Sequence, residues 1–450
     1  MEVENKKPRY PSLFNWLHKE DKQSYSLSEI EDGVEVKSDD YDLSIRSLEF
    51  DPYILTNELR IFVGTWNVGG RSPVGSLAVD LEDWLNIKNA ADMYVLGFQE
   101  IVPLKTLTVI GAEDTTVATS WNQLIGRTLN KNFGHQCSTT PMLNSSISSC
   151  NDYPNNEEGN NNNNNEYKLV ASKKMVGVFI SVWLRTEVMR KYCVSNVRVC
   201  SVACGVMGYL GNKGSVAVSM AIEGTSFCFV GAHLASGEKK GDEGRRNHQV
   251  AEIFRRTCFS RTTKLQHHYP HPLTILGHDR IFWFGDLNYR LYSEDNVARH
   301  MIRKQDWKAL QEFDQLQKEL EEGGVFEGWK EGIIEFAPTY KYSSSNRYCG
   351  GLPSRYGEKQ RTPAWCDRIL WYGKGVEQLH YLRSESKFSD HRPVSAIFST
   401  QIEIVSSRKE LVELQSIPST MLHPNHGVNN GDEDRKSTLL SLLIEDIQGC

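Results

Sequence analysis

Several features that mark other protein classes are missing from this sequence of 450 residues. Its ten cysteines form no C-x-x-C pair, which argues against a zinc site or a disulfide framework and is typical of reduced thiols. No apolar run approaches the roughly 18 residues of a membrane-spanning helix. The first residues, Met1–Lys7, also lack the apolar stretch of a signal peptide. The composition therefore predicts a soluble intracellular protein of the cytoplasm or the nucleus.

A large excess of one charge is absent too, since 51 basic residues oppose 57 acidic ones for a net charge of −6. Any anionic ligand must therefore be held by a local basic patch. Between residues 338 and 374, two acids (Glu358 and Asp367) accompany seven basic residues: Lys341, Arg347, Arg355, Lys359, Arg361, Arg368 and Lys374. Tyrosines and tryptophans are interleaved with them. This patch favours a compact ligand with several phosphates over a long polymer.

Apolar patterning divides the chain into three parts. We expect a polar N-terminal extension over residues 1–57, a single domain over residues 58–405 and a C-terminal tail over residues 406–450. Residues 139–166 interrupt the domain with a segment rich in serine and asparagine that contains six consecutive asparagines. Such a segment cannot bury enough apolar area to offset the cost of ordering it, so we predict a disordered surface insert.

Five apolar runs have the length and composition of strands, at residues 60–65, 93–98, 227–232, 281–285 and 394–398. Their nearly continuous apolar character indicates two sheets packed together and covered by helices. Helical periodicity is found over residues 80–89, 121–130, 243–259 and 305–322. Polar residues stand at one end of each apolar run, which predicts a shared site at the sheet ends: Asn67, Glu100, His233, Asp286 with Asn288, and Asp390 with His391.

Carboxylate and amide oxygens suit a hard divalent cation such as Mg²⁺, and Glu100, Asn67, Asp286 and Asn288 supply that set. Asp286 and Asn288 face the same side if the extended conformation continues past the strand. Histidine is the usual residue for proton transfer and for hydrogen bonds to a phosphoryl group. No G-x-S-x-G or P-loop pattern occurs, which argues against a serine hydrolase and a P-loop nucleotide enzyme.

Six motifs resemble those of the inositol polyphosphate 5-phosphatases, in family order between about residues 58 and 400: residues 66–70, 97–104, 211–214, 284–290, 363–370 and 389–393. The most specific are Gly-Asp-Leu-Asn-Tyr-Arg at 285–290 and Pro-Ala-Trp-Cys-Asp-Arg at 363–368. The long segments around residues 111–114 and 236–247 resemble the plant type I group. The resemblance implies the endonuclease/exonuclease/phosphatase superfamily, a four-layer α/β sandwich and Mg²⁺-dependent removal of an inositol 5-phosphate.

The resemblance also implies a role for each matched residue. Glu100 would hold the magnesium with Asn67 beside it, and Asp286 would position and deprotonate the attacking water. Asn288 and His233 would hold the scissile phosphate. His391, oriented by Asp367, would donate to the developing charge, and Asp390 would complete the network on the metal side. A neighbouring 4-phosphate would be recognised by four residues: Tyr340, Lys341, Lys359 and Arg361.

The expected substrates are phosphatidylinositol 4,5-bisphosphate, inositol 1,4,5-trisphosphate or both, in phosphoinositide signalling. A lipid substrate implies transient contact with a membrane surface, and we expect a monomer that binds no nucleic acid. Two alternatives remain at this point. Another metal-dependent phosphodiesterase or nuclease of the superfamily would share the metal residues but need a longer basic track. A catalytically silent phosphoinositide-binding protein would have lost residues such as Glu100, Asp286 or His391, which are all present.

Overall fold

The computed structural model describes residues 53–73, 77–104, 115–131, 166–260, 272–342 and 361–406. The predicted insert up to residue 165, the extension up to residue 52 and the tail beyond residue 406 lie outside the described residues. The described elements from Leu55 to Ile404 belong to one compact unit. A second unit contributes only the outermost residues of the first and last strands to the described part of the chain.

Two mixed six-stranded sheets form the centre of this unit, and all five predicted strands are confirmed. In the first sheet the order is β11 (Val376–Arg383), β12 (Val394–Ser406), β1 (Tyr53–Asn67), β2 (Met93–Gln99), β4 (Val178–Arg185) and β3 (Tyr167–Met175). In the second it is β5 (Val194–Ala203), β6 (Gly214–Ile222), β7 (Thr225–His233), β8 (Arg280–Asp286), β10 (Asp367–Gly373) and β9 (Lys330–Glu331). Strand β1 begins five residues before the domain start predicted at residue 58.

The parallel pairs are the ones that carry the site. Strand β1 runs parallel to β2, and β7 runs parallel to β8, so the carboxyl ends of each pair meet at one edge. Strand β10 runs antiparallel to β8 and therefore brings its first residue to the same edge. The polar residues that follow these strands are gathered at this end of the two sheets.

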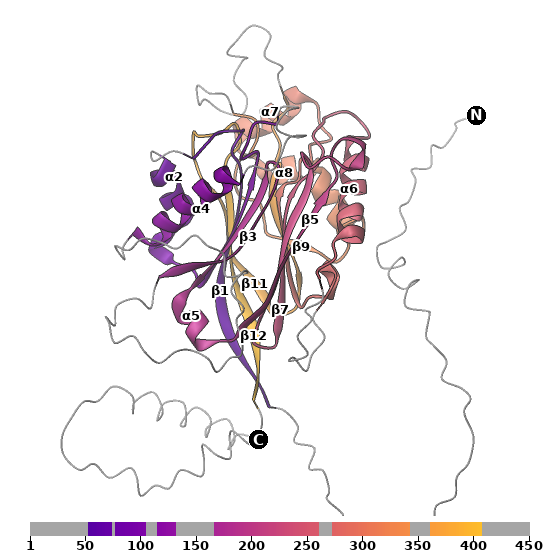
Figure 1. Cartoon of the computed structure of the whole chain (residues 1–450). Helices are drawn as coiled ribbons and strands as arrows, with labels where there is room; N and C mark the ends of the chain where they lie inside the picture. The colour runs from indigo at the N-terminus through magenta and orange to yellow at the C-terminus, as the bar shows by residue number, and fades with distance from the viewer. Residues whose placement is uncertain are drawn as a thin grey trace, which may run out of the picture. The chain divides into compact units, whose positions relative to one another are not determined.

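Three apolar clusters show how the layers pack. Between the sheets lie side chains from both of them, including Val63 and Val95 from the first and Phe229 and Phe282 from the second. The outer face of the first sheet packs against α2 (Ala78–Trp84) and α4 (Thr116–Leu129). The outer face of the second packs against α6 (Asp242–Arg256) and α9 (Gln315–Glu321). Figure 1 shows α2 and α4 on one side of the sheets and α6 on the other, which confirms the four-layer arrangement.

The remaining helices are α5 (Thr186–Lys191), α7 (Asp295–Lys304), α8 (Trp307–Gln311) and three 3₁₀ turns, η2 (Ile87–Asn89), η5 (Val206–Gly208) and η6 (Ile275–Gly277). The single helix predicted over 305–322 is wrong, because α8 and α9 replace it and α7 precedes them. The carboxylates of Asp306 and Asp314 accept the amide hydrogens of Ala309 and Gln317, so each aspartate starts a new helix.

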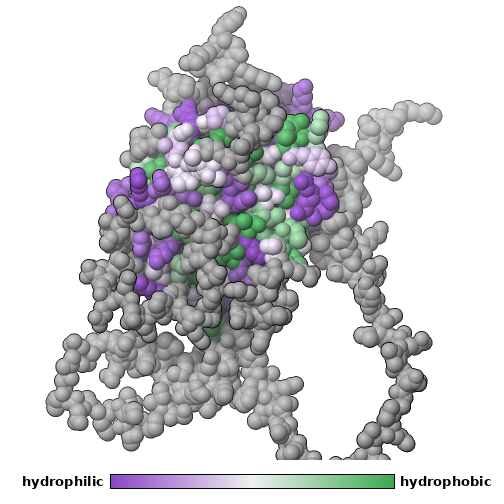
Figure 2. Space-filling model, in the orientation of Figure 1, coloured by the Kyte–Doolittle hydropathy of each residue, from purple (hydrophilic) through white to green (hydrophobic). Residues whose placement is uncertain are grey.

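Among the described helices, none has both the length and the apolar character required to cross a bilayer. Figure 2 shows hydrophilic and hydrophobic side chains interspersed over the described part of one face. The exposed large hydrophobic residues include three neighbours at η5: Val206, Met207 and Tyr209.

Candidate active site

Strand register places three of the predicted site residues side by side. In the parallel pair β7–β8, His233 lies opposite Asp286, and in the antiparallel pair β8–β10, Asp286 lies opposite Asp367. The glycine before Asp286 is required here: Gly285 has φ 148°, and a Cβ on it would lie 1.9 Å from the carbonyl oxygen of Ala232. The Gly-Asp sequence therefore permits the close approach of the two strands beside the carboxylate.

A hydrogen bond across the two sheets completes this cluster. Asn67 ends β1 in the first sheet, and its Nδ2 donates to Oδ2 of Asp286 in the second at 2.9 Å. The same oxygen lies 3.2 Å from Nε2 of His233, and Oδ1 of Asp286 accepts the amide hydrogen of Asn288 at 3.1 Å. Asp286 is only 2% exposed. Its carboxylate is thus held in one orientation from three sides.

The charges around Asp286 decide its protonation state. Burial by itself raises the pKa of this carboxyl, but the positive charge of His391, the hydrogen bond from His233 and the nearby Lys213 outweigh burial and hold the pKa well below its usual range. Asp286 is therefore ionised throughout the physiological pH range, and it can accept a hydrogen bond from water.

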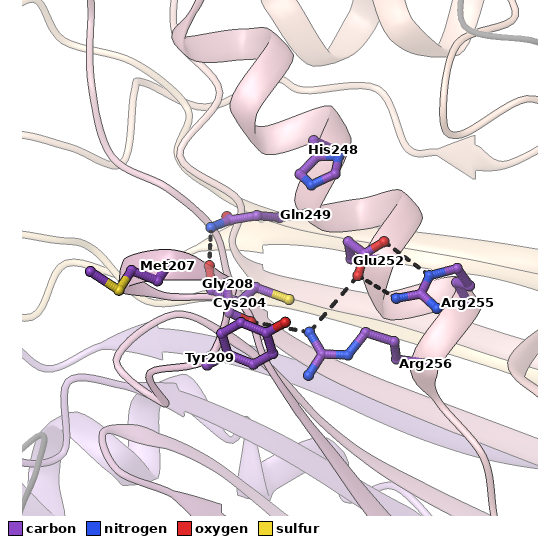
Figure 3. A pocket seen from close by; sticks show the side chains of 9 residues that line it. All are labelled: Cys204, Met207, Gly208, Tyr209, His248, Gln249, Glu252, Arg255 and Arg256. Carbon is purple, nitrogen blue, oxygen red and sulfur yellow. Dashed lines mark hydrogen bonds and ion pairs between the residues drawn. The ribbon is translucent and has the colours of Figure 1, made fainter.

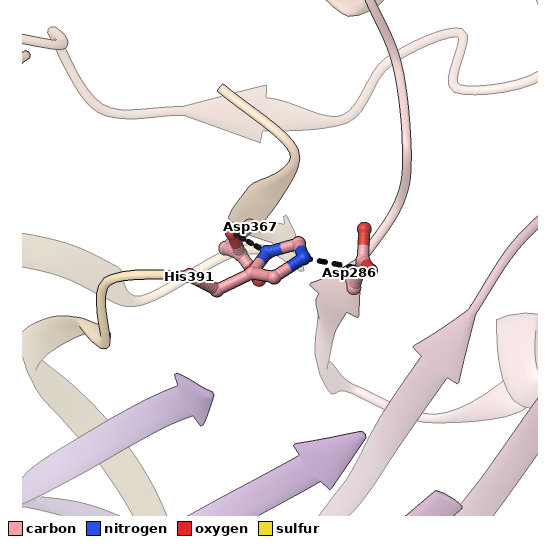
Figure 4. Close-up of side chains that lie close together, drawn as sticks. All are labelled: Asp286, Asp367 and His391. Carbon is pink, nitrogen blue, oxygen red and sulfur yellow. Dashed lines mark hydrogen bonds and ion pairs between the residues drawn. The ribbon is translucent and has the colours of Figure 1, made fainter. Parts of the chain in front are cut away.

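His391 forms a second buried pair with Asp367, as Figure 4 shows. Nδ1 of His391 lies 2.8 Å from Oδ2 of Asp367, which also accepts a hydrogen bond from the hydroxyl of Thr339 at 2.6 Å. Nε2 points toward Asp286, 3.9 Å from its Oδ2. Burial lowers the pKa of His391, but Asp367 and Asp286 outweigh it and raise the pKa to about 9. The imidazole is therefore a proton donor at neutral pH, directed at the space beside Asp286.

Lys213 is a site residue to which the sequence analysis assigned no role. It precedes β6, and Gly214 pairs with His233 in the β6–β7 ladder, so Nζ of Lys213 lies against Nε2 of His233. Burial lowers the pKa of Lys213 to about 8. Burial and the charge of Lys213 together lower the pKa of His233. The Gly-Asn-Lys-Gly stretch at 211–214 was the available signal, but only the strand register shows which residue it faces.

Glu100 follows β2 and adopts a left-handed backbone conformation, with φ 55°. Its Oε1 lies 3.5 Å from Nδ2 of Asn67 and 3.8 Å from Nε2 of His233. Its side chain is 30% exposed, unlike the buried Asp286. Strained backbone in a non-glycine residue is costly and is found most often at functional sites. The partly exposed carboxylate of Glu100 and the side-chain amide of Asn67 provide the oxygen ligands that a hydrated Mg²⁺ needs, so these residues are suited to this cation.

Asp286, Asp367 and His391 also offer three potential metal-ligand atoms within 4.8 Å of one another. Two of these groups are already joined by the hydrogen bond between His391 and Asp367, and both are nearly inaccessible to solvent. A cation bound there would be shut off from the water ligands that Mg²⁺ retains, whereas Glu100 is partly open to solvent. The donor chemistry therefore favours Glu100 and Asn67 over the buried trio.

The extended conformation assumed for Asp286 and Asn288 is wrong. Strand β8 ends at Asp286, and Asn288 has φ 57°. The side chain of Asn288 donates from Nδ2 to the carbonyl oxygen of Leu234 at 3.1 Å, while its Oδ1 accepts a hydrogen bond from Arg290. Asn288 is buried beside the cluster through a turn of the backbone and not through strand alternation. Its proposed contact with a phosphate stays a prediction.

Tyr340 lies directly against the His391 pair. Its ring packs against the imidazole at a tilt of 34° with centroids 4.5 Å apart, and the guanidinium of Arg290 lies 4.7 Å above the same ring. Lys341 places Nζ 3.8 Å from Oδ2 of Asp390. No hydrogen bond joins Asp390 to Glu100 or Asn67 in the described part of the chain, so its place in a metal-side network also stays a prediction.

The basic patch predicted at 338–374 is smaller than its residue count indicated. Arg368 is fully buried, with ion pairs to Asp314 at 2.8 Å and to Glu331. Lys374 follows the far end of β10, seven residues from Asp367 and so roughly 20 Å away along the strand. Lys341 pairs with Asp390 and Arg361 with Glu238, and Lys359 lies outside the described residues. Sequence alone does not tell a buried arginine from a surface one.

A cavity of about 280 Å³ lies outside this cluster, between η5 and α6. Figure 3 shows it lined by Cys204, Met207, Gly208, Tyr209, His248, Gln249, Glu252, Arg255 and Arg256. None of these is a predicted site residue. Its charged side chains are paired with one another, as Glu252 with Arg255 at 2.7 Å. The candidate active site therefore rests on the geometry of the strand ends and not on this cavity.

Comparison with known proteins decides the family. The model of endonuclease/exonuclease/phosphatase family 2 matches residues 64–397. The type I inositol polyphosphate 5-phosphatase 8 of Arabidopsis thaliana is 48% identical over 356 residues, which cover 77% of this chain and 72% of that protein. This chain belongs to the inositol polyphosphate 5-phosphatases. The type IV 5-phosphatase 9 of the same plant is 43% identical, covering 78% of this chain and 80% of the relative. As a 5-phosphatase, the chain is a phosphoric monoester hydrolase.

Solved structures agree with this placement. The inositol polyphosphate 5-phosphatase domain of SPsynaptojanin, in complex with inositol (1,4)-bisphosphate and calcium ion, has a TM-score of 0.61 and 29% sequence identity. The match covers 80% of this 5-phosphatase and 89% of that chain. A Cimex nitrophorin complex, at 18% identity and a TM-score of 0.50, covers 77% of this chain and 99% of the other and shows the shared fold alone. The family and fold predicted from the motifs are thus confirmed.

Proposed function

We propose that this 5-phosphatase removes the 5-phosphate from inositol compounds that also carry a 4-phosphate, with Mg²⁺ as its cofactor. The observation that carries the proposal is the cluster in which Asn67 and His233 hold the ionised Asp286 beside the Asp367–His391 pair. The similar synaptojanin domain was solved with inositol (1,4)-bisphosphate. That molecule is what remains of inositol 1,4,5-trisphosphate after loss of its 5-phosphate.

Asp286 would orient the attacking water. Its carboxylate is ionised and its two oxygens are fixed by Asn67, His233 and Asn288, so a water molecule bound to it lies in a defined direction. Its lowered pKa makes it a weak base. The proton of the water would therefore pass to Asp286 only as the oxygen bonds to phosphorus. Phosphoryl transfer depends chiefly on positioning and charge stabilisation, which a fixed carboxylate of this kind supplies.

His391 would stabilise the negative charge that develops on the phosphoryl oxygens. Its pKa of about 9 keeps it protonated at neutral pH, and Asp367 fixes the ring so that Nε2 is the donating atom. His233 and Asn288 would hold the scissile phosphate, with Lys213 adding positive charge next to His233. These groups are already held in position before the substrate binds, so little reorganisation is needed at the reaction step.

Glu100, with Asn67 beside it, would hold the Mg²⁺. The bound cation would supply positive charge to the phosphate oxygens and help to orient the water. The exposure of Glu100 leaves room for the water ligands that Mg²⁺ retains.

Recognition of the 4-phosphate would fall to Tyr340, Lys341, Lys359 and Arg361. The first two follow Thr339, whose hydroxyl binds Asp367, so they lie beside the catalytic pair. A phosphate on the ring carbon next to the scissile group would reach these side chains. Charge-assisted hydrogen bonds from lysine and arginine suit such a group.

A membrane lipid is a suitable source of this head group. Val206, Met207 and Tyr209 are 57%, 89% and 78% exposed, in the segment that leads to Lys213. Exposed apolar side chains mark a surface for apolar partners, and here they would touch the bilayer. We propose that the protein acts in phosphoinositide signalling in this way, as a monomer in transient contact with the cytoplasmic or nuclear side of a membrane.

Phosphate release from three substrates tests the proposal: phosphatidylinositol 4,5-bisphosphate, inositol 1,4,5-trisphosphate and inositol 1,5-bisphosphate. Replacing Arg361 by alanine removes a contact to the 4-phosphate that is typically worth about 1.5–3 kcal/mol. We expect kcat/KM to fall roughly 10–150-fold on the first two substrates and little on the third. Equal losses on all three would contradict the role of Arg361, and cleavage of DNA by the wild type would contradict the proposed reaction.

A further inference from the structure

Arg361 already has an anionic partner within the chain. Its Nη1 lies 2.7 Å from Oε1 of Glu238, and the amide of Thr362 points to the other carboxylate oxygen at 3.5 Å. Glu238 belongs to the segment between β7 and α6, far from Arg361 in sequence. The two side chains are 25% and 31% exposed, so the pair lies at the surface and not in the core.

The backbone on both sides of this pair is held firmly. The buried Arg246 donates from Nη1 to the carbonyl oxygens of Ala235 and Gly237, just before Glu238. On the other side, Nη2 of Arg299 in α7 donates to the carbonyl oxygen of Arg361 at 2.9 Å. The main chain is thus anchored on both sides, while the side chains of Glu238 and Arg361 are partly exposed and can change partners. A change of partner at this place requires no movement of the main chain.

The pair also lies next to the catalytic cluster. Tyr340 forms isolated β-bridges with both Ala364 and His391, so the segment that leads from Arg361 to Ala364 lies on the other side of Tyr340 from the His391 backbone. Burial raises the pKa of Tyr340, and Arg361 is among the charges near enough to oppose that rise. Burial lowers the pKa of Arg290, and Glu238 is among the nearby groups that outweigh burial and raise it. The guanidinium of Arg290 lies over the same Tyr340 ring. A ligand phosphate bound to Arg361 would thus be close to the carboxylate of Glu238.

We propose that Glu238 competes with the phosphate of the substrate for Arg361 and is a specificity-determining residue of this enzyme. The inference rests on the proposed function, because it takes the phosphate beside the scissile one as the competing anion. A carboxylate and a phosphate offer the same pair of acceptor oxygens to a guanidinium. In the free enzyme Glu238 neutralises Arg361. A substrate with the second phosphate must displace this carboxylate and tolerate its negative charge nearby, whereas a substrate without it leaves the pair intact.

The size of the effect follows from the exposure of the pair. Ion pairs at the surface are weak because water screens them, so loss of the competing carboxylate should change affinity by about two- to fivefold. Glu238→Gln keeps the shape of the side chain and removes its charge. Glu252→Gln is a matched control, since Glu252 pairs with Arg255 at the same 2.7 Å and its side chain is 26% exposed. Glu252 lines the cavity of Figure 3, which contains none of the predicted site residues.

Steady-state kinetics on inositol 1,4,5-trisphosphate and inositol 1,5-bisphosphate test the proposal. We expect Glu238→Gln to lower KM about two- to fivefold on the trisphosphate, to leave KM on the bisphosphate as in the wild type, and to have no further effect in an Arg361→Ala background. The effect should appear in KM and not in kcat, and the control should behave as the wild type. A higher KM or a lower kcat on the trisphosphate would show that Glu238 positions Arg361 instead. Equal changes on both substrates, or none, would also overturn the competition.

Binding separates this inference from the proposed reaction. Calorimetric titration with inositol 1,4-bisphosphate, which has the 4-phosphate but no 5-phosphate, needs no turnover. A lower Kd for Glu238→Gln than for the wild type supports the competition, and an unchanged or higher Kd overturns it. If the wild type released no 5-phosphate from any substrate, the proposed function would fail, and this titration would still decide the role of Glu238.

Discussion

Two buried clusters of charge lie on opposite faces of strand β10, because Asp367 and Arg368 are consecutive residues. On one face, all three nitrogens of Arg368 donate hydrogen bonds, Nε and Nη2 to the two oxygens of Glu331 and Nη1 to Oδ1 of Asp314, whose Oδ2 has no partner in the described structure. On the other face, Oδ1 of Asp367 and Nδ1 of His233 have no partner in the described structure.

The difference separates a structural network from a reactive one. Nε2 of His391 lies 3.9 Å from Oδ2 of Asp286, which is too far for a hydrogen bond. The nearby residues Glu100 and Asn288 have positive φ. Unsatisfied buried atoms and strained backbone cost free energy and persist where a ligand or a reaction uses them. The network around Arg368, in which a cation is paired with two buried carboxylates, should therefore determine stability. The cluster around Asp286, with its strained neighbours and its unpartnered His233 nitrogen, should determine turnover.

The largest effect is expected for Asp286→Asn. The substitution keeps the shape of the side chain but removes the charge that orients water and interacts with His391, so kcat should fall by roughly 10²–10⁴-fold. Measurement of kcat on inositol 1,4,5-trisphosphate, with a thermal melt of the same sample, checks this expectation. Near-normal turnover would remove Asp286 from the catalytic residues.

Arg368→Met should have the opposite profile. It leaves Asp314 and Glu331 as buried carboxylates without their cation, which typically costs about 3–5 kcal/mol. Chemical denaturation gives the free energy of unfolding, and turnover is then expressed per folded molecule. We expect a large loss of stability with kcat close to that of the wild type. A variant as stable as the wild type, or one that is folded but inactive, would contradict the assignment of stability to the Arg368 network and of turnover to the Asp286 cluster.

The pH dependence sharpens the comparison further. The pKa of His391 is raised to about 9 in the folded protein, chiefly by Asp367 and Asp286, against about 6.5 when unfolded. Its contribution to stability is therefore complete below about pH 6.5 and is lost as the pH rises through 9. The kcat should likewise fall above about pH 9. In Asp367→Asn both declines should begin at lower pH, because one of the two carboxylates is gone. A basic limb unmoved by the substitution would contradict the assignment to His391.

The smallest effect is expected for deletion of residues 146–165. The described residues on either side of the predicted insert are held together, since Asn130 exchanges two side-chain hydrogen bonds with the backbone of Tyr167. Closure entropy changes slowly with loop length, so the free energy of unfolding should shift by less than about 1 kcal/mol. Denaturation and activity assays check this, and a large loss of stability would show that the segment packs on the domain.

The sequence predicted the strand-end residues because each follows or precedes an apolar run, a local signal. It did not predict which of them touch, since the register of His233, Asp286 and Asp367 depends on strands that are far apart in the chain. Lys213 was missed because its partner is set by the pairing of β6 with β7. Arg368 was assigned to a surface patch because composition does not report which face of a strand is buried.

Helix boundaries failed for a comparable reason. Periodicity over residues 305–322 is helical throughout. Near the middle of this range, however, Asp314 caps the start of a new helix and also pairs with Arg368 in the core. Tertiary contact thus decided a break that the pattern alone did not show. The roles assigned to the individual site residues, and the domain boundaries at 58 and 405, remain predictions.

Cation dependence of 5-phosphate release tests the central claim most directly. Wild-type protein, stripped with a chelator, is titrated with Mg²⁺ on inositol 1,4,5-trisphosphate, and the product is identified by the position of its remaining phosphates. We expect no release without the cation, inositol 1,4-bisphosphate as the product, and a half-maximal Mg²⁺ concentration at least about tenfold higher in Glu100→Gln, because a ligand charge is lost. Full activity in the chelator, loss of a phosphate other than the one at position 5, or an unchanged Mg²⁺ requirement in Glu100→Gln would contradict the account.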